Sequence, residues 1–417
     1  MLLILITYFF GLFFYKTAAT VIAPFNIKAR KWIKGQWRLI KKIRSTINNV
    51  SGRQKIMWIH CSSLGEFEQG RPVIEAFKKQ YPDYKILLTF FSPSGYEVRK
   101  NYDKADWVFY LPLDLGNNAK RFIEAVNPSV VIFVKYEFWY RYLNNLKKKN
   151  IKTYLISAIF RPNQEFFRSY GGFARRMLKC FTHLFVQNER SVELLKSINI
   201  TNVTLAGDTR FDRVHQLVSQ AIEIPAIEKF KTDKPLLIAG STWSDDEEII
   251  AKYVNRHNDV RLVIAPHEVN EAHINKITKL FPNKKLIRYT QLTGSENLSE
   301  YDILIIDTIG LLMSAYRYGD WAYIGGGFNK SGIHNTLEAA TFGLPVVFGP
   351  NYSKFMEVKE LTKIQAGFSI SVQAQLDAIF NRLRTNQEFR TQAGEKSKAF
   401  VEQNLGATQI ILNSVFA

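Results

Sequence analysis

Residues 56–68, IMWIHCSSLGEFE, contain a short apolar run, a turn and the start of a helix. Ile56–His60 has the β-branched and aromatic composition of a buried strand. The small residues that follow allow a tight turn, and Ser63 with Glu66 three positions later matches the capping box of a helix amino terminus. The stretch therefore predicts a strand that passes directly into a helix, which is the repeating unit of a parallel α/β sheet.

The same alternation of short apolar runs and helix-length segments continues through both halves of the chain. In the first half, the other runs expected to form strands are Lys85–Phe90, Trp107–Tyr110, Val130–Val134, Thr153–Ile156 and His183–Val186. In the second half, they are Pro235–Ala239, Val260–Ile264, Lys285–Ile287, Ile303–Ile306, Trp321–Ile324 and Pro345–Phe348. The pattern predicts an α/β protein with two Rossmann-like domains facing a cleft, in which ligands bind beyond the carboxyl ends of the strands.

The composition excludes several classes of protein. Of the 417 residues, 46% are apolar and 22% are charged, which is normal for a packed chain and argues against disorder. The two cysteines, Cys61 and Cys180, are too few for a disulfide framework and lack the pairing that a zinc ribbon needs. The length corresponds to about two or three domains.

Positive charge is concentrated at the amino terminus. The formal net charge is +19, and residues 1–65 contribute +11 of it because they contain eleven Lys or Arg and no carboxylate before Glu66. The rest of the chain is therefore only mildly basic. This distribution favours an anionic membrane surface or phosphorylated substrates and disfavours nucleic acid, which would need basic residues on the folded body.

Residues 1–27 are expected to form a membrane anchor. Leu2–Tyr15 is almost entirely apolar or aromatic, Lys16 interrupts it, and Thr17–Ile27 continues nearly without charge. Residues 28–55 are basic and include two tryptophans, which is typical of a segment on the cytoplasmic side of a membrane interface. The sequence leaves open whether the helix spans the membrane, lies on its surface, or is a buried first helix with a solvated basic face.

Two strand-end turns in the first half carry a carboxylate. Glu66 either caps the helix that follows Ile56–His60 or faces the cleft as a general base toward a sugar hydroxyl. Glu137 lies among aromatic residues directly after the very apolar run Val130–Val134. A carboxylate in such surroundings is costly unless it is paired, and this favours a functional role for Glu137.

Glycine-rich turns in the second half favour a phosphate-containing ligand. Gly240-Ser241-Thr242 follows one expected strand, and Gly325–Gly327 follows another and leads to a helix expected from His334. Glycines permit close backbone approach, and a helix amino terminus attracts anions. Glu338, one turn into the expected helix, is placed to accept hydrogen bonds from ribose hydroxyls. Neither turn has the dinucleotide or Walker pattern, which disfavours NAD and ATP.

Eight segments in order resemble the bacterial 3-deoxy-D-manno-octulosonic acid (Kdo) transferases, membrane-bound glycosyltransferases of the two-Rossmann GT-B architecture. They are the apolar amino terminus, Ser63–Glu66, Tyr136–Trp139, Gly207–Asp212, Gly240–Trp243, Ala265–His267, Asp307–Gly310 and Gly332–Ala340. The resemblance implies transfer of Kdo from CMP-Kdo to the 6′ hydroxyl of a lipid A precursor (lipid IVA) in lipopolysaccharide core biosynthesis. It further implies inversion at the anomeric carbon, with no metal or other cofactor.

The resemblance also implies a domain organisation and a location. The expected parts are an anchor (1–27), a basic interfacial segment (28–55), an acceptor-binding Rossmann-like domain (56–215), a linker (216–234) and a CMP-Kdo-binding Rossmann-like domain (235–417). The anchor would hold the enzyme at the inner membrane, with both catalytic domains in the cytoplasm. The implied partners are CMP-Kdo, the lipid A precursor and the anionic inner-membrane surface, and nucleic acid is not among them.

Individual positions match the family's motifs. The family's catalytic base falls on Glu66, and Glu137 and Arg210 match motif positions near the cleft. The positions expected to bind substrate are Ser241, Thr242, Pro266, His267, Gly310, Leu311, Leu312, Asn335, Thr336, Leu337 and Glu338.

The chain departs from the family pattern at two of these places. His267 stands where the family commonly has Arg after Ala-Pro, and Gly310-Leu311-Leu312 replaces Gly-Glu-Leu. Both departures alter the side-chain contacts expected with CMP, whereas backbone N–H contacts can survive them.

Two other functions stay open. One is a membrane-associated GT-B glycosyltransferase that uses a UDP-sugar and a different lipid acceptor. The other is a membrane-tethered module without enzymatic activity that binds nucleic acid or lipid. Protection by CMP or CTP but not by UDP would separate Kdo transfer from the first, and duplex DNA binding with a steep salt dependence would favour the second.

Overall fold

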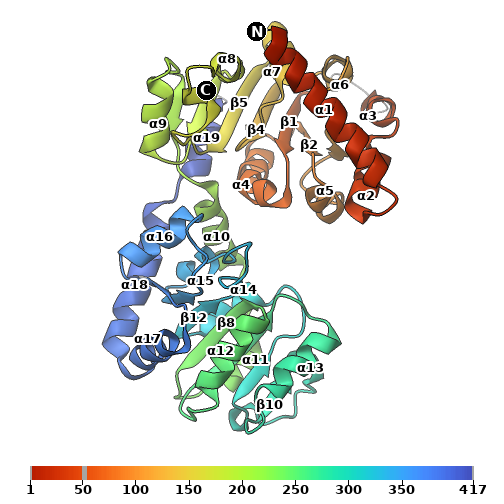
Figure 1. Cartoon of the computed structure of the whole chain (residues 1–417). Helices are drawn as coiled ribbons and strands as arrows, with labels where there is room; N and C mark the ends of the chain where they lie inside the picture. The colour runs from red at the N-terminus through yellow and green to blue at the C-terminus, as the bar shows by residue number, and fades with distance from the viewer. Residues whose placement is uncertain (1, 49–53, 416–417) are drawn as a thin grey trace. The chain divides into compact units, whose positions relative to one another are not determined.

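The computed structural model describes residues 2–48 and 54–415 and divides the chain into two compact units (Figure 1). Unit 1 comprises Met1–Arg213 together with Leu405–Ala417, and unit 2 comprises Val214–Asn404. Each unit contains a seven-stranded sheet whose paired strands run parallel. The predicted class, α/β with two Rossmann-like sheets, is confirmed.

The sheet of unit 1 has the order β3-β2-β1-β4-β5-β6-β7. Its strands are β1 (Ile56–Cys61), β2 (Lys85–Phe90), β3 (Trp107–Tyr110), β4 (Val130–Val134), β5 (Lys152–Ala158), β6 (His183–Val186) and β7 (Val203–Leu205). The six runs expected in this half all form strands, to within two residues at each end. The edge strand β7 is an addition, because a run of three residues is too short to stand out in the sequence.

Helices cover both faces of this sheet. One face packs against α3 (Leu39–Asn48), α6 (Asn118–Val126), α7 (Tyr140–Lys148), α8 (Gly172–Leu178) and α9 (Glu189–Lys196). The other packs against α4 (Leu64–Gln80) and α19 (Ala407–Val415). The unit also contains α5 (Pro93–Arg99) and the 3₁₀ turn η1 (Glu165–Phe167). Successive side chains of a strand point to opposite faces of the sheet. Because helices cover both faces, the strands are apolar throughout and do not alternate between apolar and polar residues.

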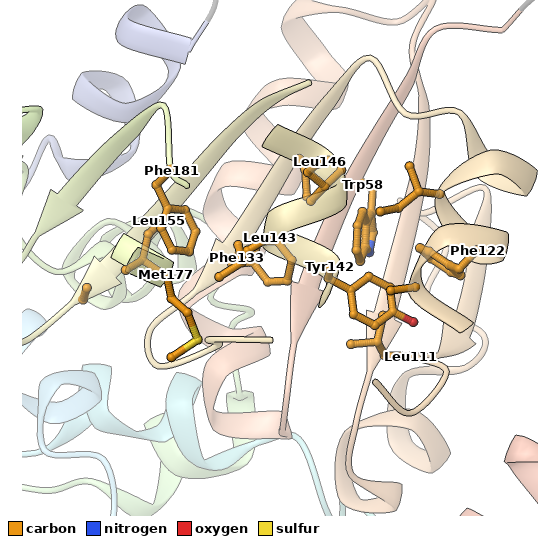
Figure 2. Close-up of a cluster of buried hydrophobic side chains, with 14 of the residues drawn as sticks. Trp58, Leu111, Phe122, Phe133, Tyr142, Leu143, Leu146, Leu155, Met177 and Phe181 are labelled. Atoms are coloured by element: carbon orange, nitrogen blue, oxygen red, sulfur yellow. The ribbon is translucent and has the colours of Figure 1, made fainter. Parts of the chain in front are cut away.

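Trp58 of β1 lies in the middle of one of these layers (Figure 2). Its ring centroid is 4.8 Å from that of Phe122 and 5.3 Å from that of Phe133. Its indole N–H donates a hydrogen bond to Thr89 Oγ1 at 2.8 Å. Burying a large apolar side chain stabilises a fold by roughly 1.5–3 kcal/mol. This layer therefore holds β1 and β4 firmly, and the carboxyl ends of these two strands carry the site described below.

The sheet of unit 2 has the order β10-β11-β9-β8-β12-β13-β14. Its strands are β8 (Leu236–Thr242), β9 (Arg261–Pro266), β10 (Leu286–Arg288), β11 (Ile303–Ile305), β12 (Trp321–Ile324), β13 (Val346–Phe348) and β14 (Gly367–Ser369). The six expected runs are again strands, to within three residues at each end, and the short edge strand β14 is the addition.

Helices α12 (Ser244–Val254), α13 (Glu271–Lys279) and α17 (Gln373–Thr385) pack in a core cluster of unit 2. The other helices of the unit are α11 (Pro225–Phe230), α14 (Leu312–Ala315), α15 (Leu337–Thr341), α16 (Met356–Lys363) and α18 (Gln387–Gln403). The 3₁₀ turns are η2 (Tyr289–Gln291), η3 (Leu298–Glu300) and η4 (Tyr316–Tyr318), and α10 (Thr209–Gln220) runs from unit 1 into unit 2.

The two units divide the chain differently from the expected domains at two segments. Residues 216–234 are not a separate linker but part of unit 2, because Ile227 and Phe230 of α11 are fully buried there. The last helix, α19, belongs to unit 1 rather than to the second domain. Its apolar side chains pack against the face of the unit 1 sheet that α4 also covers.

Helix α1 (Leu2–Ile22) lies along unit 1 (Figure 1). The Tyr8 hydroxyl donates a hydrogen bond to Asp114 Oδ2 at 2.9 Å, so one side of the helix is attached to the domain. Its outward side includes Phe10, Phe13 and Phe14, which are 59%, 58% and 68% exposed. Within the described residues, Leu5–Ile22 is long and apolar enough to cross a membrane.

The basic segment that follows contributes to the core of unit 1. Helices α2 (Ile27–Gln36) and α3 bury Trp32, Leu39 and Ile43, whereas Trp37 is 75% exposed. The expected interfacial segment (28–55) is therefore amphipathic, with an apolar side in the domain and basic residues outside. Residues 49–53 of that segment lie outside the described residues.

Candidate active site

The strand order of each sheet contains a switch point, where the chain passes from one half of the sheet to the other. In unit 1 this point lies between β1 and β4, and in unit 2 between β8 and β12. Ligands of open α/β sheets bind beyond the carboxyl ends of the strands at such points. The predicted site residues can therefore be located relative to these four strand ends.

Glu66 and Glu137 lie in the turns that follow β1 and β4. Glu66 is in the first turn of α4, and its Oε2 accepts a hydrogen bond from the Ser63 N–H at 2.9 Å. The predicted helix cap is thus present, and the carboxylate is still partly exposed. Glu137 is only 6% exposed. Lys135 before it has a φ of +70°, an uncommon value for a residue with a side chain, and this turn directs the chain away from β4.

Hydrogen bonds fix the Glu137 carboxylate in place. Its Oε2 lies 3.0 Å from His60 Nε2 and accepts the Trp139 indole N–H at 2.6 Å. On the other side of the His60 ring, Nδ1 lies 2.9 Å from Thr89 Oγ1. His60 is fully buried at the end of β1. The carboxylate of one strand end is therefore held by the imidazole of its neighbour.

This arrangement changes the acidity of Glu66. Burial, and then the charge of Glu137, raise the pKa of Glu66 above the ordinary glutamate value. The charges of His60 and Lys135 and the Ser63 N–H act in the opposite direction. A raised pKa brings a carboxyl group closer to the range suited to proton transfer near neutral pH.

Arg210 is held by an acidic neighbour at the start of α10. Its Nη2 and Nε atoms donate to Asp208 Oδ2 at 2.7 and 2.9 Å. Asp212, in the same motif, accepts the N–H groups of Gly406 and Thr408 at 2.7 Å each and so attaches the start of α19 to unit 1. This motif has a structural function, and a catalytic role for Arg210 stays a prediction.

In unit 2, Asp246 joins the two turns at the switch point. Its Oδ2 accepts the N–H groups of Trp243 at 3.0 Å and Gly326 at 2.8 Å, and its Oδ1 accepts the Tyr323 hydroxyl at 2.8 Å. Burial raises the pKa of Asp246, and these three hydrogen bonds oppose that effect. A Cβ on Gly325 would lie 2.2 Å from the Ser241 carbonyl oxygen, so the close approach of the two turns requires glycine.

Three aromatic rings stack beside these turns. The ring planes of Trp243 and His334 are nearly parallel, 7° apart, and the Trp243 indole N–H donates to His334 Nε2 at 3.0 Å. His267 stacks on both, with its ring centroid 4.7 Å from Trp243 and 4.6 Å from His334. Burial, and then His267, lower the pKa of His334, which agrees with its role as an acceptor. The His267 N–H also donates to the Thr242 carbonyl at 2.9 Å.

The helix expected from His334 begins three residues later, as α15. The His334 N–H donates to the Gly325 carbonyl at 3.1 Å, and the Leu337 N–H donates to Asn335 Oδ1 at 3.2 Å, so the chain turns before it becomes helical. Glu338 is the second residue of α15, not one turn into it, and accepts Asn335 Nδ2 at 3.0 Å. Helix α15 has only five residues, and an anion site at its amino terminus stays a prediction.

Gly310, Leu311 and Leu312 follow β11, and α14 begins at Leu312. Gly310 has a φ of +100°, which favours glycine, so this turn does not tolerate a side chain there. A Cβ on Gly240 would lie 2.9 Å from a Leu312 methyl group, which places this turn against the end of β8. Substrate binding by these residues, and by Ser241, Thr242, Pro266 and Thr336, stays a prediction.

Some residues of both clusters could not be recognised from the sequence. The pairing of His60 with Glu137 could not be recognised because His60 lies inside an apolar strand. Asp246 could not be recognised because it resembles any acidic residue at the start of a helix. The Tyr136 hydroxyl is buried without a hydrogen-bond partner among the described residues, and burial, with a smaller contribution from the charge of Glu66, raises its pKa. Within the same described residues, no group of three or more His, Cys, Asp or Glu is arranged to hold a metal ion.

Comparison with known protein structures establishes the fold independently. UDP-GlcNAc 2-epimerase from Neisseria meningitidis, in a structure bound to UDP-GlcNAc, matches with a TM-score of 0.58 and 16% identity over 86% of this chain and 99% of that one. MurG from Acinetobacter baumannii matches with a TM-score of 0.55 and 12% identity over 87% of this chain and 99% of that one. At these identities the likeness concerns the fold alone, which is GT-B-like.

Comparison of sequences shows which family the chain is similar to. A profile described as 3-deoxy-D-manno-octulosonic-acid transferase (kdotransferase) matches residues 37–213. The 3-deoxy-D-manno-octulosonic acid transferase of Aquifex aeolicus is 28% identical over 350 residues, covering 82% of this chain and 89% of the relative. That of Haemophilus influenzae is 25% identical over 373 residues, covering 86% of both chains. Over most of its length the chain is similar to Kdo transferases, which are glycosyltransferases.

Proposed function

We propose that this enzyme transfers Kdo from CMP-Kdo to a lipid A precursor in the biosynthesis of the lipopolysaccharide core, and that it inverts the configuration at the anomeric carbon. Similarity to the Kdo transferases supports the type of transfer. The observation that carries the mechanism is the pair of carboxylates, Glu66 and Glu137, at the switch point of unit 1, of which the partly exposed one has a raised pKa.

Glu66 is the general base of this proposal. The hydroxyl oxygen of the acceptor attacks the anomeric carbon of Kdo while its proton passes to the Glu66 carboxylate. The bond between that carbon and the phosphate oxygen of CMP breaks with its electron pair, and CMP leaves. Because Oε2 is held by the Ser63 N–H, Oε1 is the atom that takes the proton. A positioned base typically contributes about 10²–10⁴ in rate.

Glu137 and His60 act through Glu66. The hydrogen bond between them keeps a second negative charge buried near the base, and this charge contributes to the raised pKa of Glu66. Both are positioning residues in this mechanism, because Glu137 is held by His60 and Trp139 rather than directed toward a substrate.

Unit 2 binds CMP-Kdo. The edge formed by Trp243, His267 and His334 offers flat rings beside the glycine turns, where backbone N–H groups can approach a phosphate. Asn335 and Glu338, joined by their own hydrogen bond, are placed to meet ribose hydroxyls. We expect no metal requirement, because these groups can stabilise the leaving phosphate by hydrogen bonds.

Helix α1 attaches the enzyme to the inner membrane, with both units in the cytoplasm. It is bound to unit 1 through Tyr8 and exposes Phe10, Phe13 and Phe14 on its outer side. A helix held in this way is suited to lie in the membrane interface with its apolar side in the lipid. The basic residues of α2 and α3 then meet the anionic surface.

The decisive experiment incubates the full-length protein in detergent with CMP-Kdo and lipid IVA and measures the mass of the lipid product. We expect one or more Kdo additions, insensitivity to EDTA, and competition by CMP but not by UDP. A lipid product formed from a UDP-sugar, with no turnover of CMP-Kdo, would contradict the proposal and support a different GT-B transferase.

A further inference from the structure

A second pocket lies in unit 1 between α1, the start of α6 and one side of α7. Its volume is about 340 Å³, enough for a small polar headgroup. Lys120, Arg141 and Lys148 line it together with three asparagine amides, and the described residues that line it include no carboxylate. Glu66 and Glu137 do not line it, so it is separate from the proposed active site.

The guanidinium of Arg141 is already oriented in this pocket. Its Nη1 donates to the Gly116 carbonyl at 2.7 Å, and its central carbon lies 4.0 Å from the ring centroid of Phe9. Its Nε is buried and has no hydrogen-bond partner among the described residues. A fixed guanidinium loses little conformational freedom when it binds an anion, and its planar fork matches the oxygens of phosphate and carboxylate groups.

The pocket has an apolar wall next to its cationic end. Leu5 and Phe9 form this wall, and both belong to α1, whose outer side is apolar and exposed. A free inorganic anion would leave this wall unused, whereas a phospholipid has both a phosphate and an apolar part. We propose that the pocket binds the phosphate headgroup of an anionic membrane phospholipid, distinct from the glycolipid acceptor.

Charge complementarity and position both support this occupant. Three cations and no carboxylate line the pocket, with the buried Asp114 behind it as the acid that interacts with Arg141. The helix that closes the pocket is the one suited to enter the membrane interface. A lipid bound between α1 and α7 would hold α1 against unit 1 from the membrane side, next to the hydrogen bond from Tyr8 to Asp114.

Lys148 and Lys149 provide a matched test. They are adjacent and exposed at the end of α7, but only Lys148 lines the pocket. The full-length protein is titrated with monomeric dihexanoyl phosphatidylglycerol, and separately with phosphatidylcholine vesicles that contain a minority of phosphatidylglycerol. We expect saturable binding of the monomeric lipid, weakened about five-fold by Lys148→Ala, the usual effect of one basic residue, and unchanged by Lys149→Ala.

A second variant, Asn144→Asp, introduces a carboxylate into the pocket and should weaken monomer binding at least as much. Equal effects of the two lysine variants on the monomer, or no saturable binding, would overturn the proposal in favour of general surface attraction. A raised acceptor KM for Lys148→Ala in detergent would also overturn it, by assigning the pocket to the acceptor. None of the binding assays contains CMP-Kdo, so their failure is distinct from failure of the proposed transferase activity.

Discussion

His60 Nε2 lies 3.0 Å from the Glu137 carboxylate, and this bond joins the ends of β1 and β4 at the switch point of unit 1. Both side chains are buried, and Thr89 on β2 holds the far side of the imidazole. The carboxylate therefore cannot rotate toward solvent without leaving an unpaired ring nitrogen in the core. Its negative charge is a fixed part of the surroundings of Glu66.

The first prediction concerns this charge. Glu137→Gln keeps the size and an acceptor oxygen for His60 and Trp139 but removes the negative charge that helps to raise the pKa of Glu66. The pKa of Glu66 should fall, and the acid limb of the kcat/KM–pH profile should move to lower pH. Glu124→Gln, at an exposed position of α6, is the control and should leave the profile in place. If the acid limb of Glu137→Gln did not move, Glu137 would not contribute to the pKa of Glu66.

The second prediction concerns Asp114, which accepts hydrogen bonds from the Tyr8 hydroxyl at 2.9 Å and the Arg141 N–H at 3.0 Å. Burial raises its pKa to about 6. The pKa of Asp114 is higher in the folded state than in the unfolded state. The contribution of this carboxyl group to the free energy of unfolding is therefore complete below about pH 3.9 and is lost as the pH rises through about 6.

Asp114→Asn should therefore gain stability relative to the wild type between pH 4 and pH 7.5, by about 3 kcal/mol in the free energy of unfolding. Chemical denaturation of both proteins at each pH measures this difference. Asp83→Asn, at an exposed position, should show no comparable change. A difference between wild type and Asp114→Asn that does not vary with pH would show that the carboxyl has an ordinary pKa.

The third prediction concerns donor binding in unit 2. Glu338→Ala removes the carboxylate that accepts Asn335 Nδ2 and that is expected to meet the ribose of CMP. Loss of hydrogen bonds to a charged group should raise the KM for CMP-Kdo about ten-fold or more and leave the acceptor KM unchanged. Glu395→Ala, on the exposed side of α18, is the matched control. If only the acceptor KM rose, the turn before α15 would bind the acceptor and not CMP-Kdo, and the prediction would be wrong.

Strands and turns were predictable because parallel sheets are buried on both faces. Val130–Val134 is apolar at every position, and such a run is unambiguous in the sequence. The three-residue edge strand Val203–Leu205 cannot be recognised in this way, because it is partly exposed and has no hydrophobic pattern of its own. The sequence also did not indicate the unit to which α19 belongs, because the apolar residues of a helix do not specify which sheet the helix packs against.

The site was predictable where residues follow one another closely and not where distant strands meet. Ser63 and Glu66 are three residues apart, so both the cap and the candidate base could be recognised locally. His60 and Glu137 are 77 residues apart, and their contact depends on β1 and β4 being neighbours. The early turn before α15 arises from a long-range bond, from the His334 N–H to Gly325, which local helix signals do not contain.

The last prediction tests the base itself. Glu66→Gln keeps an oxygen that can accept the Ser63 N–H, so α4 should retain its amino terminus and the protein its fold. An amide cannot take a proton from the acceptor hydroxyl, so kcat should fall by about 10²–10⁴ while the KM for CMP-Kdo stays near the wild-type value. Glu68→Gln is the matched control, because Glu68 lies two residues further along α4 and binds Arg99 at 2.8 Å. A purely structural Glu66 would give the opposite result, a loss of about 1 kcal/mol in stability with near-normal turnover. Retention of more than about a tenth of wild-type kcat by Glu66→Gln, well above the usual loss for a missing base, would exclude the base role.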